Sequence, residues 1–211
     1  MFNPVKRIAR PALLAVLLLL LGSASVALAA PAGTVIGLSG AVSVASAGRS
    51  GPLQLGQPVQ AGDTVDVAAG AKLKLRMADG SVVSVASGTR LTIAAYAADA
   101  AGQRQEARLS LTQGLLRAVV APVQRPASFE VDTAVGTAAV RSTDWFVQVV
   151  AGAMQVGVLT GSVDITSAAT RRAVTIPARW GARLEAGRDP VSPRVWSTAE
   201  FDDVIARTDV K

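Results

Sequence analysis

The chain has 211 residues, of which 50% are hydrophobic and only 4% are aromatic, and its formal net charge is +6. This length fits one domain of ordinary size, with a sizeable core built from Val, Leu, Ile and Ala. The absence of Cys and His excludes disulfides, thiol nucleophiles, imidazole bases and most zinc or copper sites.

Residues 1–29 have the pattern of a signal peptide. Three basic residues within positions 6–10 precede the apolar run 12–21, and the small residues Ala27 and Ala29 follow at the distance that a signal peptidase reads. We expect cleavage after Ala29. The alternative, an uncleaved membrane anchor, is disfavoured because the apolar run is shorter than the ~20 residues that span a bilayer.

Cleavage would leave a periplasmic or secreted protein with no stable membrane span. Removal of the three N-terminal cations lowers the formal net charge from +6 to +3, because residues 1–29 contain no acid. So small a charge does not favour a nucleic acid as the partner, and neither does the compartment.

From residue 33 onward, short apolar–polar alternations are separated by Gly-rich turns, which predicts β-strands. Asp79-Gly80 is a strong hairpin signal. Within 72–77 the outward residues are all cationic, namely Lys72, Lys74 and Arg76. They form either a binding stripe for an anionic partner such as a polysaccharide, or a solvated face that blocks edge pairing. The second interpretation is favoured because charged outer faces are ordinary for half-buried strands.

The middle of the chain contains its densest run of β-forming residues, Val131–Val149, around which we expect the fold to be organised. Before it, the Ala-rich segment 94–107 predicts either a short helix or a long connection between two strands. The runs 108–111 and 115–120 then predict a strand pair about Gly114.

Arg141 lies inside this apolar central run. A buried arginine must find a carboxylate or carbonyl groups, and Asp132 and Asp144 are the candidates nearest in sequence. We therefore expect an ion pair that organises the core, with a ligand contact as the alternative.

One helix is predicted at the C-terminal end. Ser197 and Glu200 have the spacing of a capping box, in which each side chain satisfies a backbone amide of the other residue. The helix should run to Arg207 with Phe201, Val204 and Ile205 on its apolar face. We expect it to pack on its own domain, and docking to a partner is the alternative.

Together these patterns predict an all-β protein, either a Gly-rich short-strand sandwich or barrel or a β-roll, with one short C-terminal helix. The expected organisation is a signal peptide at 1–29, a β domain at 33–187, and a loop with the amphipathic helix at 188–211.

The order of the turn motifs carries a family resemblance. The run Leu55–Leu75 with Gly62-Asp63-Thr64, the turn Asp79-Gly80-Ser81 and the later Gly114-Leu115-Leu116 resemble a FecR domain. Ala139–Thr143 and Gly161-Ser162-Val163 fit its second half, so the resemblance covers roughly residues 33–187. It implies an extracytoplasmic, non-catalytic interaction module of the kind found in envelope proteins.

The chain departs from that family in two respects. Arg141-Ser142-Thr143 stands where the family usually has Arg-Gly-Thr, so Ser142 would be strained if that glycine needs a positive φ. The regulator that names the family also has a cytoplasmic anti-sigma segment and a membrane helix before this domain. In this chain we expect a signal peptide there instead, so the resemblance does not imply direct control of a sigma factor.

We therefore expect an exported binding module of the bacterial cell envelope, acting in signalling or envelope assembly, whose partner is an envelope protein or a polysaccharide. The candidate partner-binding residues are Lys72, Lys74, Arg76 and Arg141. No cofactor is expected. The alternative is a structural protein that assembles through its edge strands or binds polysaccharide.

Enzymatic activity is disfavoured. A glycan hydrolase would need a pair of carboxylates such as Asp63 with Asp66, or Asp132 with Asp144. Asp63 is explained by turn chemistry, and Asp66 alternates with valines and should face solvent. No catalytic or metal-binding residue is therefore predicted.

Overall fold

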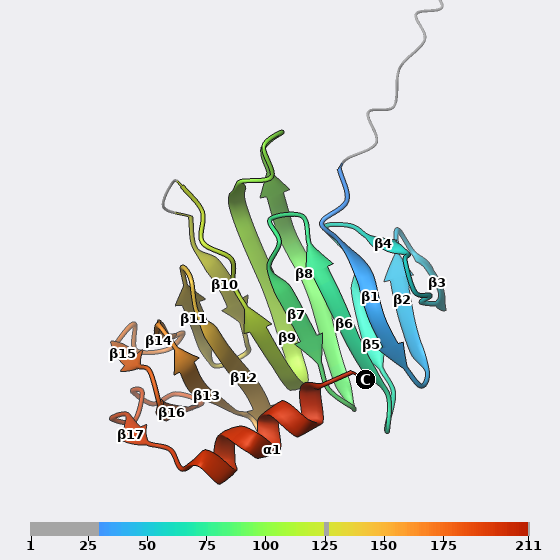
Figure 1. Cartoon of the computed structure of the whole chain (residues 1–211). Helices are drawn as coiled ribbons and strands as arrows, with labels where there is room; N and C mark the ends of the chain where they lie inside the picture. The colour runs from blue at the N-terminus through green and yellow to red at the C-terminus, as the bar shows by residue number, and fades with distance from the viewer. Residues whose placement is uncertain (1–29, 125–126, 211) are drawn as a thin grey trace, which may run out of the picture.

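The computed structural model describes residues 30–124 and 127–210, and these residues form two stacked, mainly antiparallel sheets and one helix (Figure 1). The all-β prediction with a single short C-terminal helix is confirmed, and the architecture is a sandwich. The predicted signal peptide lies outside the described residues. Among the described residues, no helix has both the length and the apolar character needed to cross a bilayer.

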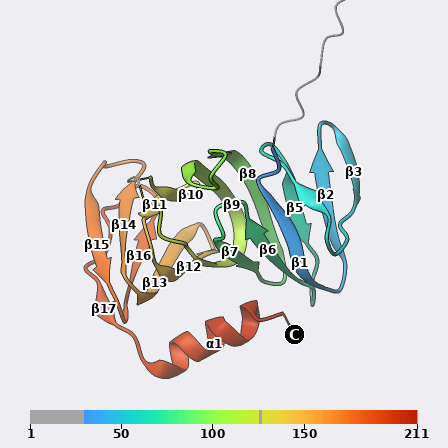
Figure 2. The same cartoon turned by 45° about the horizontal axis from the view of Figure 1, so that its top comes forward.

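Sheet A lies on the side of the helix and sheet B on the other side (Figure 2). In spatial order, sheet A contains β4 (Pro58–Val59), β1 (Gly33–Ser39), β6 (Lys72–Met77), β7 (Val82–Val85), β9 (Arg104–Val119), β12 (Asp144–Val150), β13 (Ala153–Thr160), β16 (Trp180–Glu185) and β17 (Arg194–Val195). Sheet B contains β3 (Arg49–Pro52), β2 (Val42–Ser46), β5 (Thr64–Val67), β8 (Thr89–Ala98), β9, β10 (Phe129–Asp132), β11 (Gly136–Val140), β14 (Ser162–Ser167) and β15 (Ala173–Pro177).

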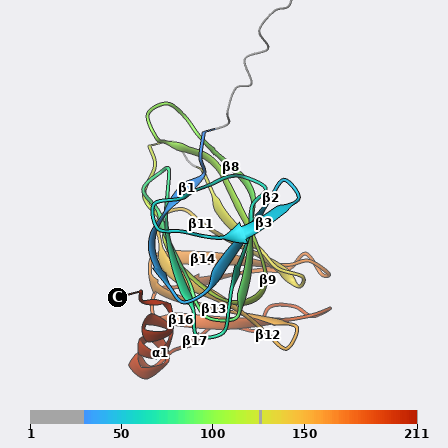
Figure 3. The same cartoon turned by 90° about the vertical axis from the view of Figure 1, so that its right-hand side faces the viewer.

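The core lies between the two sheets. Figure 3 shows these sheets turned by 90° from the view of Figure 1. The core consists mainly of Val, Leu, Ile and Ala side chains, as the composition predicts, with Phe129 and Trp145 as its large aromatic members. Alternation along β12 places Trp145 and Val147 in this core, while Phe146 faces the opposite side of sheet A.

Strand β9 joins the two sheets, because its first half pairs with β8 and β10 in sheet B and its second half pairs with β7 and β12 in sheet A. The predicted strand pair about Gly114 is therefore wrong: the two runs form one bent strand. Gly114 sits at the bend with φ +96°, and a Cβ there would lie 2.6 Å from the Cα of Thr89. Glycine is required at this corner for both reasons.

The helix alternative for 94–107 is also wrong. Strand β8 continues to Ala98, a turn follows, and β9 begins at Arg104, so the segment is a long β-hairpin. The strand that organises the fold is β9, which pairs in both sheets. Val131–Val149 contains β11, the last two residues of β10 and all of β12 except Val150.

Candidate interaction surface

Helix α1 (Thr198–Thr208) lies across the outer face of sheet A (Figure 2). The predicted capping box is present: the Ser197 hydroxyl accepts from the Glu200 amide at 3.3 Å, and the Ser197 amide donates to Glu200 Oε2 at 2.8 Å. The helix ends one residue beyond the predicted Arg207, and Phe201 and Val204 are buried as predicted. The helix therefore docks on its own domain.

An aromatic cluster holds the start of this helix. The ring centroid of Phe146 lies 5.2 Å from that of Trp196 and 6.3 Å from that of Phe201. Two glycines of sheet A make room for these rings, because a Cβ at Gly157 would collide with the Phe146 ring and a Cβ at Gly181 with the Trp196 indole. The packing of α1 thus depends on the absence of side chains at two strand positions.

We expect Gly181→Ala to displace Trp196 and loosen α1 while the sandwich stays folded. The added methyl group would occupy the space of the indole, and Trp196 belongs to a cluster separate from the core between the sheets. Amide hydrogen exchange of α1 should become faster. Gly51→Ala is the control, because a Cβ there meets nothing within 4 Å; equal exchange in the two variants would contradict the prediction.

Two of the three predicted cationic residues, Lys72 and Lys74, contact the other end of α1. Lys72 Nζ donates to the carbonyl oxygens of Ala206 at 2.7 Å and Asp209 at 2.9 Å, and Lys74 Nζ lies 3.3 Å from Asp209 Oδ1. Ammonium groups at this end satisfy unpaired carbonyls and complement the helix dipole. The favoured interpretation as a merely solvated face is therefore wrong for these two lysines. Arg76 is exposed and forms no ion pair with the part of the chain that the structure describes.

The N-terminal end of α1 carries an ion pair on its surface. Arg194 Nη2 donates to Glu200 Oε1 at 2.6 Å, and the Arg194 guanidinium lies 5.4 Å from the centroid of the Trp196 ring. The hydrogen bond from Arg194, followed by the one from the Ser197 amide, lowers the pKa of the Glu200 carboxyl from 4.5 to about 2.

This shift predicts that α1 loosens in acid. The pKa of Glu200 is lower in the folded than in the unfolded state, so the ionised carboxylate stabilises the folded state. This stabilisation is fully present above pH 4.5 and is lost as the pH falls through about 2. The NMR amide signals of α1 should shift over that window, and Glu200→Gln should abolish this step. A step that persists in Glu200→Gln would assign it to another carboxyl group.

Arg141 is not the buried arginine that the sequence predicted. Its side chain is exposed, and it forms no ion pair within the described residues. Asp132 instead accepts from the Thr137 hydroxyl at 2.6 Å, and Asp144 lies 2.7 Å from Nη2 of Arg117. The expected core ion pair of Arg141 is therefore wrong, because the neighbouring carboxylates have other partners.

Ser142 has no positive φ, so the predicted strain is absent.

Arg141 lines an open groove with a volume of about 580 Å³ between β11 and the start of β14. Besides Arg141, the polar residues that line the groove are Ser128, Ser142, Thr143, Ser162 and Asp164. The ligand contact that was the alternative for Arg141 stays a prediction.

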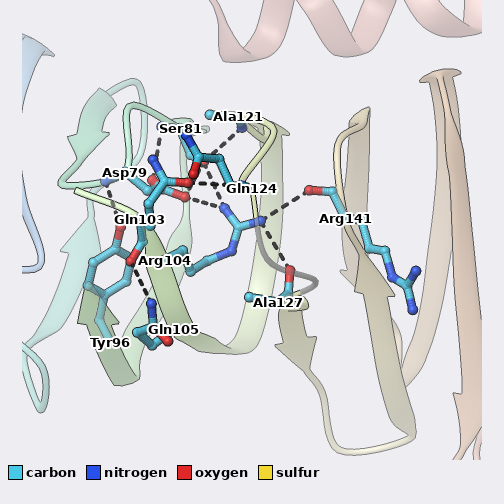
Figure 4. Close-up of polar contacts among 10 residues, drawn as sticks. All are labelled: Asp79, Ser81, Tyr96, Gln103, Arg104, Gln105, Ala121, Gln124, Ala127 and Arg141. Carbon is cyan, nitrogen blue, oxygen red and sulfur yellow. Dashed lines mark hydrogen bonds and ion pairs between the residues drawn. The ribbon is translucent and has the colours of Figure 1, made fainter. Parts of the chain in front are cut away.

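The buried arginine is Arg104, which the sequence interpretation missed (Figure 4). Its guanidinium forms an ion pair with Asp79, and both side chains are completely buried. It also donates to the carbonyl oxygens of Ala127 at 3.3 Å and Arg141 at 3.1 Å. Figure 4 shows the Arg141 side chain pointing away from this centre, so only its backbone takes part.

The Asp79–Arg104 pair lies in a wider polar network. The Asp79 amide donates to the Tyr96 hydroxyl at 2.9 Å, and burial together with the Asp79 charge raises the pKa of Tyr96. The Ser81 hydroxyl donates to Asp79 at 2.8 Å and accepts from the Ala121 amide at 3.0 Å. The network joins the β6–β7 turn to β8, to β9 and to the segment after β9. Its role is therefore structural.

The carboxylates considered for catalysis are occupied by structural contacts. Asp63 is buried and accepts from the Gln60 amide at 2.8 Å, and Asp66 lies 2.6 Å from Nε of Arg90. The two other candidates pair with Thr137 and Arg117, as described above. Within residues 30–124 and 127–210, no group of three or more metal-ligating side chains could hold a metal ion.

Comparison with known protein families gave a match within the β domain. Residues 63–164 match the family model described as FecR protein. Comparison with curated proteins gave no match.

Two crystal structures of a candidate anti-sigma factor from Parabacteroides distasonis, at 1.65 and 2.50 Å resolution, resemble the chain. Each gives a TM-score of 0.55 at 15% sequence identity over 66% of this chain and 62% of the other. This likeness shows a shared fold, and this chain spans less than two thirds of the length of that protein.

Proposed function

Because this chain carries a FecR domain at residues 63–164, we propose that it is an exported, non-catalytic protein-interaction module that acts in signalling at the bacterial cell envelope. The observation that carries the proposal is the FecR match on a fold shared with a candidate anti-sigma factor. Both point to a signalling or regulatory module rather than to an enzyme.

The geometry supports a surface that binds protein. The carboxylates that could form a catalytic pair have structural partners, as shown above. The outer face of sheet A, by contrast, already binds an amphipathic helix through aromatic side chains and lysines. Aromatic side chains are enriched in protein–protein interfaces, and complementary charges across an interface fix its specificity and register.

Export is supported by the signal-peptide pattern of residues 1–29. Cell fractionation with N-terminal sequencing of the purified protein tests it directly. The expected result is a protein outside the cytoplasm that begins at Ala30. A cytoplasmic protein that retains Met1 would contradict it.

The interaction itself is tested by crosslinking in intact cells, followed by affinity capture of the tagged protein and mass spectrometry. The proposal predicts a discrete second protein that is absent when an unrelated exported protein carries the same tag. Recovery of the chain alone would contradict a heterologous partner.

Self-assembly is the second candidate, because β15 pairs only with β14 among the described strands and leaves one edge open. Open edges can pair with another copy. Analytical ultracentrifugation separates the two functions: self-assembly predicts oligomers that Thr175→Pro dissolves, whereas the proposed module sediments as a monomer before its partner is added.

A further inference from the structure

Helix α1 covers a surface of sheet A with an apolar part and a cationic part. The apolar part is formed by Ala86, Leu115, Phe146 and the half-buried Leu159, and the cationic part by Lys72 and Lys74. We call these six residues the helix shelf. The apolar part meets the aromatic anchors at the start of α1. The cationic part meets the end of α1, where Lys72 binds backbone carbonyl oxygens and Lys74 binds the Asp209 carboxylate.

Charge complementarity extends beyond the direct contacts. Residues 198–210 contain four acidic side chains and one basic one, a formal charge of −3. Since the chain from residue 30 onward carries +3, the remainder of it carries +6. The helix is therefore an acidic segment docked on a basic domain, and its removal would leave a basic surface around an apolar patch.

The attachment of α1 is independent of the main core. Its anchors Trp196, Phe201 and Val204 belong to the small cluster on the shelf, which is separate from the cluster between the sheets. A helix of 11 residues is marginal in isolation, so α1 depends on these few contacts. Local release of such an element costs much less than global unfolding.

The helix also leaves part of the surface unfilled. One groove of about 400 Å³ runs along one side of α1 from Ala199 to Arg207 and is lined on the domain by Phe146, Gln148 and Gln155. A second groove of about 450 Å³ lies at its end and is lined by Ser39 and Lys72 with Val210. The surface therefore accommodates a longer or bulkier helix than α1.

We propose that the helix shelf is an exchangeable docking site for an acidic amphipathic helix, which α1 occupies in cis and which a helix of the partner protein occupies when it binds. The proposal rests on the proposed function and assigns its binding surface. The partner helix that fits has an aromatic residue facing Phe146 and carboxylates or free carbonyls facing Lys72 and Lys74. In this arrangement α1 competes with the partner and sets the threshold for binding.

A synthetic peptide of residues 194–211 tests the exchange without the partner. Labelled with fluorescein, it is titrated into the chain from Ala30 to Lys211, as wild type and as Phe201→Ala. In the wild type the tethered helix competes at an effective concentration of about millimolar. Phe201→Ala weakens that competitor, so the peptide should bind this variant at least about tenfold more tightly than the wild type.

Two controls define the binding mode. In the first, a peptide that itself carries Phe201→Ala should bind the Phe201→Ala protein at least about tenfold more weakly than the unchanged peptide does. In the second, adding Lys72→Ala and Lys74→Ala to the Phe201→Ala protein should weaken its binding of the unchanged peptide. If Phe201→Ala does not fold, Ser197→Gly with Glu200→Ala opens the helix through its cap without changing a buried residue. Equal peptide affinities in opened and wild-type protein, with release of α1 verified by hydrogen exchange, would overturn the proposal.

The same variant tests the partner. Capture from intact cells should recover more of the partner with Phe201→Ala than with the wild type, because the competing helix is weakened. Unchanged or reduced recovery would overturn the assignment of the shelf to the partner. Peptide exchange without any captured protein would instead refute the proposed function and leave the docking site standing.

Discussion

Replacing Gly114 with alanine is expected to destabilise the whole sandwich. Gly114 lies at the corner where β9 passes from sheet B to sheet A, its φ is +96°, and a Cβ would lie 2.6 Å from the Cα of Thr89. A left-handed conformation costs a residue with a side chain about 1–2 kcal/mol, and forced overpacking adds about 1–3 kcal/mol. The total is a large fraction of the roughly 5–15 kcal/mol that stabilises a domain.

Urea denaturation should therefore show a loss of about 2–5 kcal/mol in the free energy of unfolding for Gly114→Ala. Gly51→Ala is again the matched control, since a Cβ there meets nothing within 4 Å. A loss no greater for Gly114→Ala than for Gly51→Ala would show that the bend in β9 does not require glycine.

Removing the buried guanidinium is the second change with a large expected effect. Arg104→Met should destabilise the protein by about 3–5 kcal/mol, because it leaves the carboxylate of Asp79 buried without its counter-ion. It also removes the donor to the carbonyl oxygens of Ala127 and Arg141. Chemical denaturation measures the loss.

Arg108→Met on the same strand is the control. The Arg108 side chain is 51% exposed, and its nitrogen lies 3.1 Å from Glu130, so this pair should contribute less than about 1 kcal/mol. The double variant Asp79→Ala with Arg104→Met should recover part of the loss, because no buried charge then remains unpaired. Similar losses for Arg104→Met and Arg108→Met would contradict the assignment of a structural centre at Arg104.

Local patterns predicted the features that depend on local chemistry. The alternation of residue types along β6 and β12 predicted that successive side chains lie on opposite faces of the sheet, and Asp79-Gly80 predicted the β6–β7 turn. The spacing of Ser197 and Glu200 gave the start of α1, because both groups of a capping box lie within one helical turn.

The features that the sequence did not predict depend on contacts between distant residues. Nothing local distinguishes Arg104, which is buried, from Arg141, which is exposed, because the difference arises where β9, the β6–β7 turn and the segment before β10 meet. Lys72 meets Ala206 across a sequence separation of 134 residues, so the pattern of β6 alone could not show that the lysines hold a helix. The continuity of β9 was missed because a glycine usually marks a turn between strands, whereas Gly114 here bends a single strand.

The central claim, that the chain binds a protein partner through the outer face of sheet A, is tested most directly by site-specific photo-crosslinking in intact cells. A photoreactive residue replaces Arg76, which is exposed on β6 beside the helix shelf, or Arg49, which is exposed on the edge strand β3 of sheet B. We expect a crosslink to one discrete protein from position 76 and none from position 49. Crosslinks from both positions alike, or from position 49 alone, would contradict it.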